Sequence, residues 1–284
     1  MSNHIVNPGR REFFKGMGAA GIGAAALLAA GGFNPAEADF DSSATPDDPN
    51  AIFTAALIAE DLATTFYYNS LVGAVIADPA LAGPGGTATN VSSGGNAGNV
   101  NYIQAALSQE IAHANLLRSL VNGSDASGDP YQTFYFPAGT FDTLAAFTAM
   151  LDALESAFIG AYLAAVRQFS FMASRPNSFY VNAAQTHTYS RDDLSYFAQV
   201  SASIMGVECE HRTLGRVISN TNPANNLTYE STDGITNVFH GATSAVNALT
   251  PFLTPSTGPA YSLAMALANQ ATVSIPSTGS VPPA

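Results

Sequence analysis

Apolar residues recur at the three- and four-residue spacing of an amphipathic helix in four long segments of this 284-residue chain. We predict helices over about residues 51–77, 101–122, 141–174 and 190–220, bounded by proline, glycine or polar capping residues. Between the first two lies a segment rich in Gly, Ser, Thr and Asn, residues 82–99, which predicts a surface loop. The pattern predicts an all-α fold, a four-helix bundle with long connections.

Polar residues at the helix starts and a long connection refine this prediction. Asn101 with Gln104 resembles a capping box at the second helix, and Ser190 with Asp193 does the same at the fourth. The Pro- and aromatic-rich residues 129–137 predict a short extended stretch. About 18 residues separate the second and third helices, enough to cross the bundle end to end, so neighbouring helices can run parallel.

The N-terminus has the pattern of an export signal rather than of a folded domain. Residues 9–15 (GRREFFK) resemble the bacterial twin-arginine consensus, and a Gly/Ala-rich apolar run leads to a small-residue cleavage site at Ala36-Glu37-Ala38. We therefore predict a signal peptide over residues 1–38 and a periplasmic or secreted protein exported by the twin-arginine route.

The remaining chain divides into three parts by composition. Residues 39–50 form an acidic linker, and residues 51–220 hold the four predicted helices. Residues 221–284 form a C-terminal extension, for which we expect short helices near 234–249 and 260–271 and a flexible tail. No stretch after the signal approaches ~20 uninterrupted apolar residues, the length of a membrane helix, so we expect no stable membrane anchor.

Glutamate is scarce after residue 38, and its placement is specific. Only six glutamates occur there, and four of them fall in the middle of the four apolar segments. Two of these four are followed three residues later by histidine. The six residues are Glu60, Glu110, His113, Glu155, Glu208 and His211. Positions three and four residues from them are mostly apolar, so we expect these side chains to point inward.

Burying four ionised carboxylates together is costly unless something neutralises them. Two divalent ions carry the matching charge, and a Glu from each of two helices plus Glu-x-x-His from the other two is a known di-metal ligand set. Arginine is the rival neutraliser. Arg212 lies one helical turn after Glu208, but no arginine lies at helical spacing from Glu60. The sequence therefore predicts a site for two Fe or two Mn ions.

Charge and cysteine content exclude other classes of function. With residues 1–38 set aside, six arginines stand against 19 acidic side chains, so no basic patch for nucleic acid is expected. Cys209 is the single cysteine, which excludes an intramolecular disulfide. It follows Glu208 directly, about 100° round a helix from it, so we expect a buried thiol rather than a ligand.

With these motifs in place, about residues 51–220 resemble the ferritin-like superfamily, and more narrowly the exported bacterial ferritin-like proteins related to plant desiccation-related proteins. The resemblance is carried by ALIAEDLATTFYY around Glu60, SQEIAHANLLRSL around Glu110, LDALESAFIGAYLAA around Glu155 and MGVECEHRTLGRV around Glu208. It implies a division of the ligands between two ions. Glu110 and Glu208 bridge both ions and are the catalytic pair, Glu60 and His113 complete one ion, and Glu155 and His211 complete the other.

The resemblance also implies oxidative chemistry with O2, peroxide or ferrous iron as partners. Manganese-catalase-like peroxide disproportionation is a second enzymatic alternative, and a non-catalytic stress or desiccation protein with structural metal is a third. The long loop and the C-terminal extension argue against bulk iron storage, whereas a homo-oligomer is compatible with the pattern. Tyr67 and Tyr162 each follow a helix glutamate by seven residues, and either support the site or pack in the core.

Overall fold

The structure is a computed structural model that describes residues 46–121, 125–175, 180–181, 188–221, 229–230, 236, 242–255 and 258–273. The predicted signal peptide and the C-terminal tail lie outside the described residues. Four long helices dominate: α2 (Pro49–Val72), α3 (Ala97–Val121), α4 (Leu144–Ser174) and α5 (Arg191–Ile218). The predicted all-α bundle with short extra C-terminal helices is confirmed.

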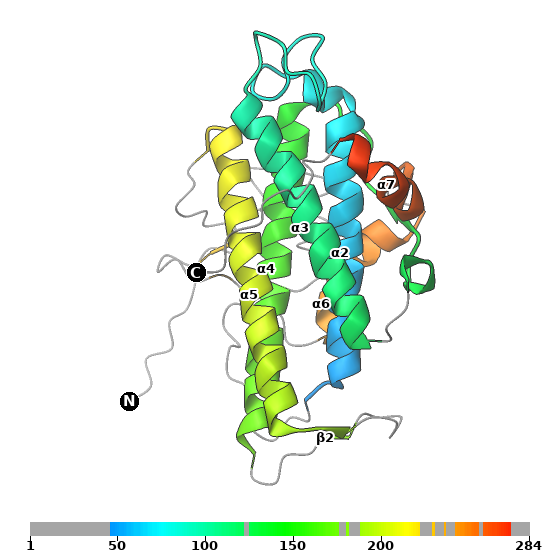
Figure 1. The fold of residues 1–284 in the computed structure, drawn as a ribbon, viewed down its shortest axis with the longest axis vertical. Coiled ribbons are helices and arrows are strands. Elements are labelled where there is room, and N and C mark those ends of the chain that lie inside the picture. The colour runs from blue at the N-terminus through cyan, green and yellow to red at the C-terminus, as the bar shows by residue number, and fades with distance from the viewer. Residues whose placement is uncertain are drawn as a thin grey trace, which may run out of the picture.

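The four helices pack as two antiparallel pairs (Figure 1). α2 packs mainly on α3 and α4 mainly on α5, while the α2–α4 and α3–α5 contacts are smaller. The direction of the colour gradient shows that α3 and α4 run the same way along the bundle. The connection between them therefore crosses the bundle from end to end, which its length allows.

Local capping explains why three of these helices begin where they do. The Asp48 side chain accepts a hydrogen bond from Asn50 N, and Pro49 occupies the first turn of α2, where its missing N–H costs nothing. Thr143 accepts from Ala146 N at the start of α4. Ser190 and Asp193 form a reciprocal capping box at α5, which confirms the predicted start of the fourth helix.

The predicted start of the second helix is wrong. α3 begins at Ala97, four residues before Asn101, and Asn96 Oδ1 accepts a hydrogen bond from Asn99 N in the first turn. Gln104 does not cap the helix. Its amide donates instead to the backbone carbonyls of Ala88 and Val273. The Asn101–Gln104 pattern therefore does not form a cap, because Asn96 caps the helix further upstream and distant carbonyl groups bind the Gln104 amide.

The first helix also ends earlier than predicted. α2 stops at Val72, Gly73 adopts an extended conformation, and a 3₁₀ turn, η4 (Ala74–Ala77), follows. Val75 N donates to the carbonyl of Phe141, and a Cβ on Gly73 would lie 2.9 Å from Phe141 Cβ. A tertiary contact with the chain before α4 therefore redirects the backbone five residues before the predicted end.

The C-terminal extension packs back onto the bundle. β4 (Ala260–Ser262) pairs antiparallel with β1 (Thr133–Tyr135), which is the extended stretch predicted within residues 129–137. α6 (Ala242–Leu253) contacts both α2 and α4, and α7 (Leu263–Asn269) contacts α2 (Figure 1). α6 begins later than its predicted helix near 234–249.

The remaining regular elements are short. Two 3₁₀ turns, η5 (Ala126–Gly128) and η6 (Gln270–Thr272), lie in the α3–α4 connection and after α7. β2 (Tyr180–Val181) pairs antiparallel with β3 (Thr188–Tyr189) between α4 and α5.

Aromatic residues form two apolar clusters at different heights along the bundle. One contains Phe66 and Phe147, whose rings stack with centroids 5.1 Å apart. The other contains Phe53 and Phe169, with centroids 4.9 Å apart. On α2 and on α4, the central glutamate lies between these two levels in sequence. The acidic residues therefore lie between two hydrophobic layers that exclude water.

α4 is, among the described residues, the one helix long and apolar enough to cross a membrane by length and composition. Within its most apolar window, 72% of the residues are buried inside the protein. Its apolar character is therefore accounted for by packing against the other helices.

Candidate metal centre

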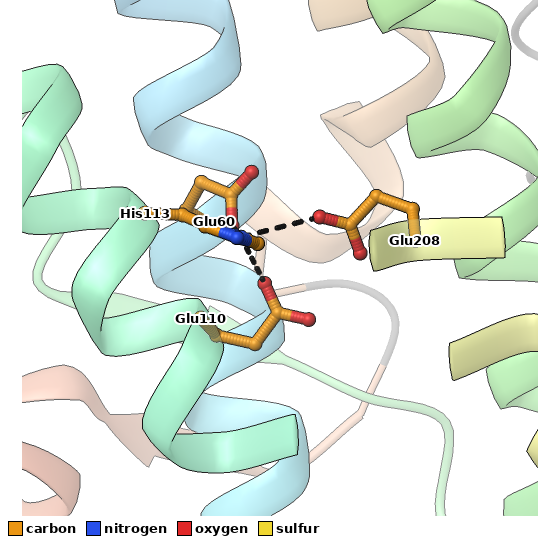
Figure 2. Close-up of side chains that lie close together, drawn as sticks. All are labelled: Glu60, Glu110, His113 and Glu208. Atoms are coloured by element: carbon orange, nitrogen blue, oxygen red, sulfur yellow. Dashed lines mark hydrogen bonds and ion pairs between the residues drawn. The ribbon is translucent and has the colours of Figure 1, made fainter. Parts of the chain in front are cut away.

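Each long helix contributes to one cluster at the centre of the bundle. α2 carries Glu60, α4 carries Glu155, and α3 and α5 each carry a Glu-x-x-His pair. Because residues three apart on a helix share a face, each pair directs its carboxylate and imidazole the same way. Figure 2 shows Glu60, Glu110, His113 and Glu208 converging from three helices. The structure brings all six sequence-predicted residues together.

The cluster consists of two overlapping groups of four residues. In each group, one ligand atom per residue can be chosen so that all four atoms lie within 4.8 Å of one another. The first group is Glu60, Glu110, His113 and Glu208, and the second is Glu110, Glu155, Glu208 and His211. Glu110 and Glu208 belong to both groups. Each therefore lies between Glu60 and His113 on one side and Glu155 and His211 on the other.

Individual oxygen atoms make this division clear. Glu110 presents Oε2 to His113 Nδ1 at 3.6 Å and Oε1 to His211 Nδ1 at 2.9 Å. Glu208 presents Oε1 to His113 Nδ1 at 3.3 Å and Oε2 to His211 Nδ1 at 3.2 Å. The two shared carboxylates therefore each turn one oxygen toward each imidazole, which is the orientation that a carboxylate bridging two cations requires.

The outer two glutamates each belong to one side. Glu60 Oε2 lies 3.3 Å from His113 Nδ1, and Glu155 Oε1 lies 3.9 Å from His211 Nδ1. The four glutamates and His211 are at most 2% exposed, whereas the His113 side chain is 12% exposed. His113 is thus the one member of the cluster with appreciable contact with solvent.

Several buried carboxylate oxygens lack a hydrogen bond. Within the part of the chain that the structure describes, Glu110 Oε1 and Oε2, Glu155 Oε2 and Glu208 Oε1 have no hydrogen-bond partner. Buried polar atoms are normally satisfied, and leaving them unsatisfied costs free energy. The Glu110 and Glu208 atoms among them lie between 2.9 and 3.6 Å from an imidazole Nδ1, so cations placed between these groups would supply the missing interactions.

The electrostatics describe how the cluster holds protons without metal. Burial, then the charges of Glu110 and Glu208, raise the pKa of Glu60, and burial, then the charge of Glu208, raises the pKa of Glu155. Burial lowers the pKa of both imidazoles, but the surrounding carboxylates outweigh it and raise the pKa of His113 and of His211. Metal ions would therefore compete with protons for these ligands.

The donor set fits divalent metal ions. Carboxylate oxygen with imidazole nitrogen suits Fe, Mn and Zn, and four carboxylates balance the charge of two divalent ions. His211 Nε2 lies 2.9 Å from Gln109 Oε1. A hydrogen bond from Nε2–H to this acceptor leaves Nδ1 as the ligand atom facing the carboxylates, as in many metal sites.

Tyrosine side chains surround the glutamates. Tyr67 OH donates to Glu155 Oε1 at 2.5 Å, and Tyr162 OH donates to Glu60 Oε1. Both tyrosines are at most 2% exposed. The sequence left open whether these tyrosines support the site or only pack in the core, and the hydrogen bonds favour support of the site. Tyr102, which donates to the backbone carbonyl of His211 at 2.5 Å, and Gln109 were missed by sequence reasoning.

Arginine does not neutralise the cluster. Among the described residues, no arginine forms an ion pair with any of the four central glutamates. Arg212, which the sequence places within reach of Glu208, pairs instead with Glu230 at 3.0 Å. Arg216 contacts the same Glu230 at 3.0 Å and Asp152 at 2.7 Å. These pairs hold Glu230 of the extension against α4 and α5, leaving the centre to other cations.

A second buried ion network adjoins the cluster. Arg118 contacts Asp61, the neighbour of Glu60, and Asp129, each at 2.6 Å. It ties α2, α3 and the α3–α4 connection together. Cys209 is half-buried rather than fully buried as the sequence predicts. It belongs to neither ligand group, and burial raises the pKa of its thiol.

Four helices that direct two Glu-x-x-His pairs and two further glutamates into one buried cluster define the carboxylate-rich class of four-helix bundles. A model of the ferritin-like domain matches residues 48–221, more than half of the chain, and the chain belongs to this family. Comparison with curated proteins and with solved structures finds no match.

Proposed function

We propose that this protein binds two Fe or two Mn ions and carries out oxidative chemistry on O2, peroxide or ferrous iron. The observation that carries the proposal is the shared position of Glu110 and Glu208, each of which turns one oxygen to either side of the cluster. Membership of the ferritin-like family supports it. A cluster that served only to bury charge would not need two overlapping ligand groups.

The ligands divide between the ions as the sequence resemblance implies. Glu60 and His113 would complete one ion, Glu155 and His211 would complete the other, and Glu110 and Glu208 would bridge them. When bound, two such redox-active ions supply electrons in pairs to O2 or peroxide. The protein's own contribution is to hold the carboxylates, to orient Glu60 and Glu155 through the two tyrosine hydroxyls, and to exclude water with the flanking aromatic layers.

Elemental analysis together with turnover tests the proposal. Protein purified from its native host would be analysed for Fe and Mn, and the same sample assayed for O2 consumption, ferrous-iron oxidation and O2 release from peroxide. About two ions per chain with turnover would support it. Manganese with O2 release would select the catalase-like form, and iron with O2 consumption the oxidase form. Tightly held but inert metal would overturn the enzymatic proposal in favour of a structural role in a stress or desiccation protein.

Export is a separate part of the proposal and rests on the sequence alone. The twin-arginine pattern at residues 9–15 and the cleavage site at residues 36–38 support passage to the periplasm or outside. Cell fractionation of the full chain and of an Arg10→Lys/Arg11→Lys variant tests it. Retention of the variant in the cytoplasm is expected, and equal export of both would contradict the route.

A further inference from the structure

An apolar cavity lies in the seam between α2 and α4 and ends beside the metal centre. Its volume is about 30 Å³. Most of its lining is alanine: Ala55, Ala56 and Ala59 on α2 and Ala161, Ala164 and Ala165 on α4. Ala245 of α6 completes it from the C-terminal extension, which packs over the same seam (Figure 1). The four-helix bundle alone would leave this side of the cavity uncovered.

The exposure of the lining residues gives the cavity a direction. Ala56 and Ala161 are partly exposed, so they mark its outer end. Ala59, which directly precedes Glu60, and Tyr162 are buried and mark the inner end. Because the Tyr162 hydroxyl donates to Glu60 Oε1, the inner end is one hydrogen bond away from the centre.

Size and polarity limit what the cavity can admit. A site for one water molecule needs about 10–15 Å³ on this measure, so about 30 Å³ suits a diatomic molecule but not an organic substrate. Gln168 is the one strongly polar lining residue, and its amide is engaged with Asp47 through hydrogen bonds of 2.7 and 2.8 Å. A hydrated cation or peroxide would lose hydrogen bonds there without replacement, whereas an apolar gas would lose none.

We propose that this α2–α4 cavity is the entry route by which O2 reaches the centre. The inference rests on the proposed function and deepens it by assigning O2 and the polar partners to different approaches to the centre. Polar partners, peroxide and ferrous iron, have a different approach at His113, the one ligand with 12% exposure. Both approaches lead to the half of the site formed by Glu60 and His113, so we assign the first encounter with O2 to that half.

Xenon is the probe that tests the route without metal, because it is an apolar gas that binds in dry apolar cavities. Crystals of the metal-free protein under xenon pressure are expected to show xenon between Ala161 and Ala55. Ala161→Leu would fill the cavity and remove that density. Ala149→Leu is the matched control, since Ala149 is also a partly buried alanine of α4 but does not line the cavity.

Kinetics of the metal-loaded protein provide the second readout. Ala161→Leu is expected to raise KM for O2 several-fold and to leave the rate at saturating O2 and the use of peroxide unchanged, while Ala149→Leu changes neither. Xenon absent from the cavity of the parent protein would overturn the route. So would an unchanged KM for O2 in a variant that excludes xenon.

These outcomes separate the route from the proposed function. Turnover with O2 in a protein whose cavity takes no xenon would refute the route alone. Metal-loaded protein that turns over peroxide but consumes no O2 would refute the route and leave the catalase-like form of the function standing. Metal-loaded protein that turns over neither O2 nor peroxide would refute the function and the route together, whatever xenon shows.

Discussion

The phenol of Tyr67 donates a 2.5 Å hydrogen bond to Oε1 of Glu155, although the two residues lie 88 positions apart on different helices. Tyr162 makes the reciprocal bond to Oε1 of Glu60. Each tyrosine follows the glutamate of its own helix by seven residues and contacts the glutamate of the other. The crossed bonds occupy Oε1 of each outer glutamate. The other oxygen of Glu60, Oε2, lies beside His113, whereas Glu155 Oε2 has no hydrogen-bond partner among the described residues.

This arrangement predicts a specific effect of removing either hydroxyl. Tyr67→Phe would free Glu155, and Tyr162→Phe would free Glu60, so each variant is expected to weaken one of the two ions. Loss of a hydrogen bond to a metal ligand typically lowers metal affinity by about 10–100-fold. Titration against a competing chelator measures it, with Tyr68→Phe as control because Tyr68 is a neighbouring α2 tyrosine outside the cluster. Equal weakening in all three variants would rule out the assignment.

The shared position of Glu110 and Glu208 predicts unequal metal loss on substitution. Glu110→Ala and Glu208→Ala are each expected to lose both ions, whereas Glu60→Ala mainly loosens one. The fold should survive in Glu60→Ala, because the charges of Glu110 and Glu208 raise the pKa of Glu60 and its removal relieves that repulsion in the metal-free state. Metal content per chain, with circular dichroism as the check on folding, gives the answer. The bridging assignment fails if the three variants lose metal equally.

The ligand cluster could be predicted from the sequence because its information is local. A spacing of three fixes Glu110 with His113, and Glu208 with His211, on one helix face, whatever the rest of the chain does. The scarcity of glutamate then makes Glu60 and Glu155 the remaining candidates. Long helices with strong periodicity are likewise recoverable, and the Ser190–Asp193 capping box at α5 was identified because both partners lie within one turn.

Features that depend on distant partners were missed or wrong. Gln104 has the spacing of a capping residue, yet its amide donates to carbonyls 16 and 169 positions away. Arg212 lies one turn from Glu208 in sequence, yet pairs with Glu230. Side chains this long have several acceptors within reach, and only the packing of the extension decides among them. Gln109 is missed for a related reason, since its contact with His211 depends on the relative rotation of α3 and α5.

The network around Arg118 predicts a pH dependence of stability. Burial raises the pKa of Asp61 to about 8; Arg118 opposes this, and the charge of Asp129 adds to it. In the unfolded chain an aspartate ionises near pH 4. Between about pH 4 and pH 8 the unfolded state therefore gives up a proton that the folded state keeps, so the contribution of Asp61 to the free energy of unfolding falls as pH rises.

Asp61→Asn isolates this contribution because it cannot ionise. Each pKa unit corresponds to about 1.4 kcal/mol. Between pH 5 and pH 8 the free energy of unfolding of the variant should therefore rise relative to that of the parent protein by at least ~1 kcal/mol. Urea unfolding of both metal-free proteins at the two pH values measures it. Arg118→Met is the opposite case, since it leaves the buried side chains of Asp61 and Asp129 without the cation that contacts both, and should cost about 3–5 kcal/mol. A stability difference between Asp61→Asn and the parent that is independent of pH would show that Asp61 is ionised in the folded state.

Two glycines of α5 predict opposite outcomes for one substitution. A Cβ on Gly215 would lie 2.2 Å from Cδ2 of Leu151, a fully buried residue of α4, so Gly215 is where the two helices approach most tightly among the glycines of α5. Gly206 has nothing within 4 Å of the same position. Gly215→Ala should destabilise by about 1–3 kcal/mol through overpacking. Gly206→Ala should stabilise by about 0.5–1 kcal/mol, because alanine loses less backbone entropy in a helix. Denaturant unfolding of both variants checks the signs. Stabilisation by Gly215→Ala would contradict this tight contact, because it would mean that the buried Leu151 side chain moves aside at little cost and that α4 and α5 are not closely packed at this level.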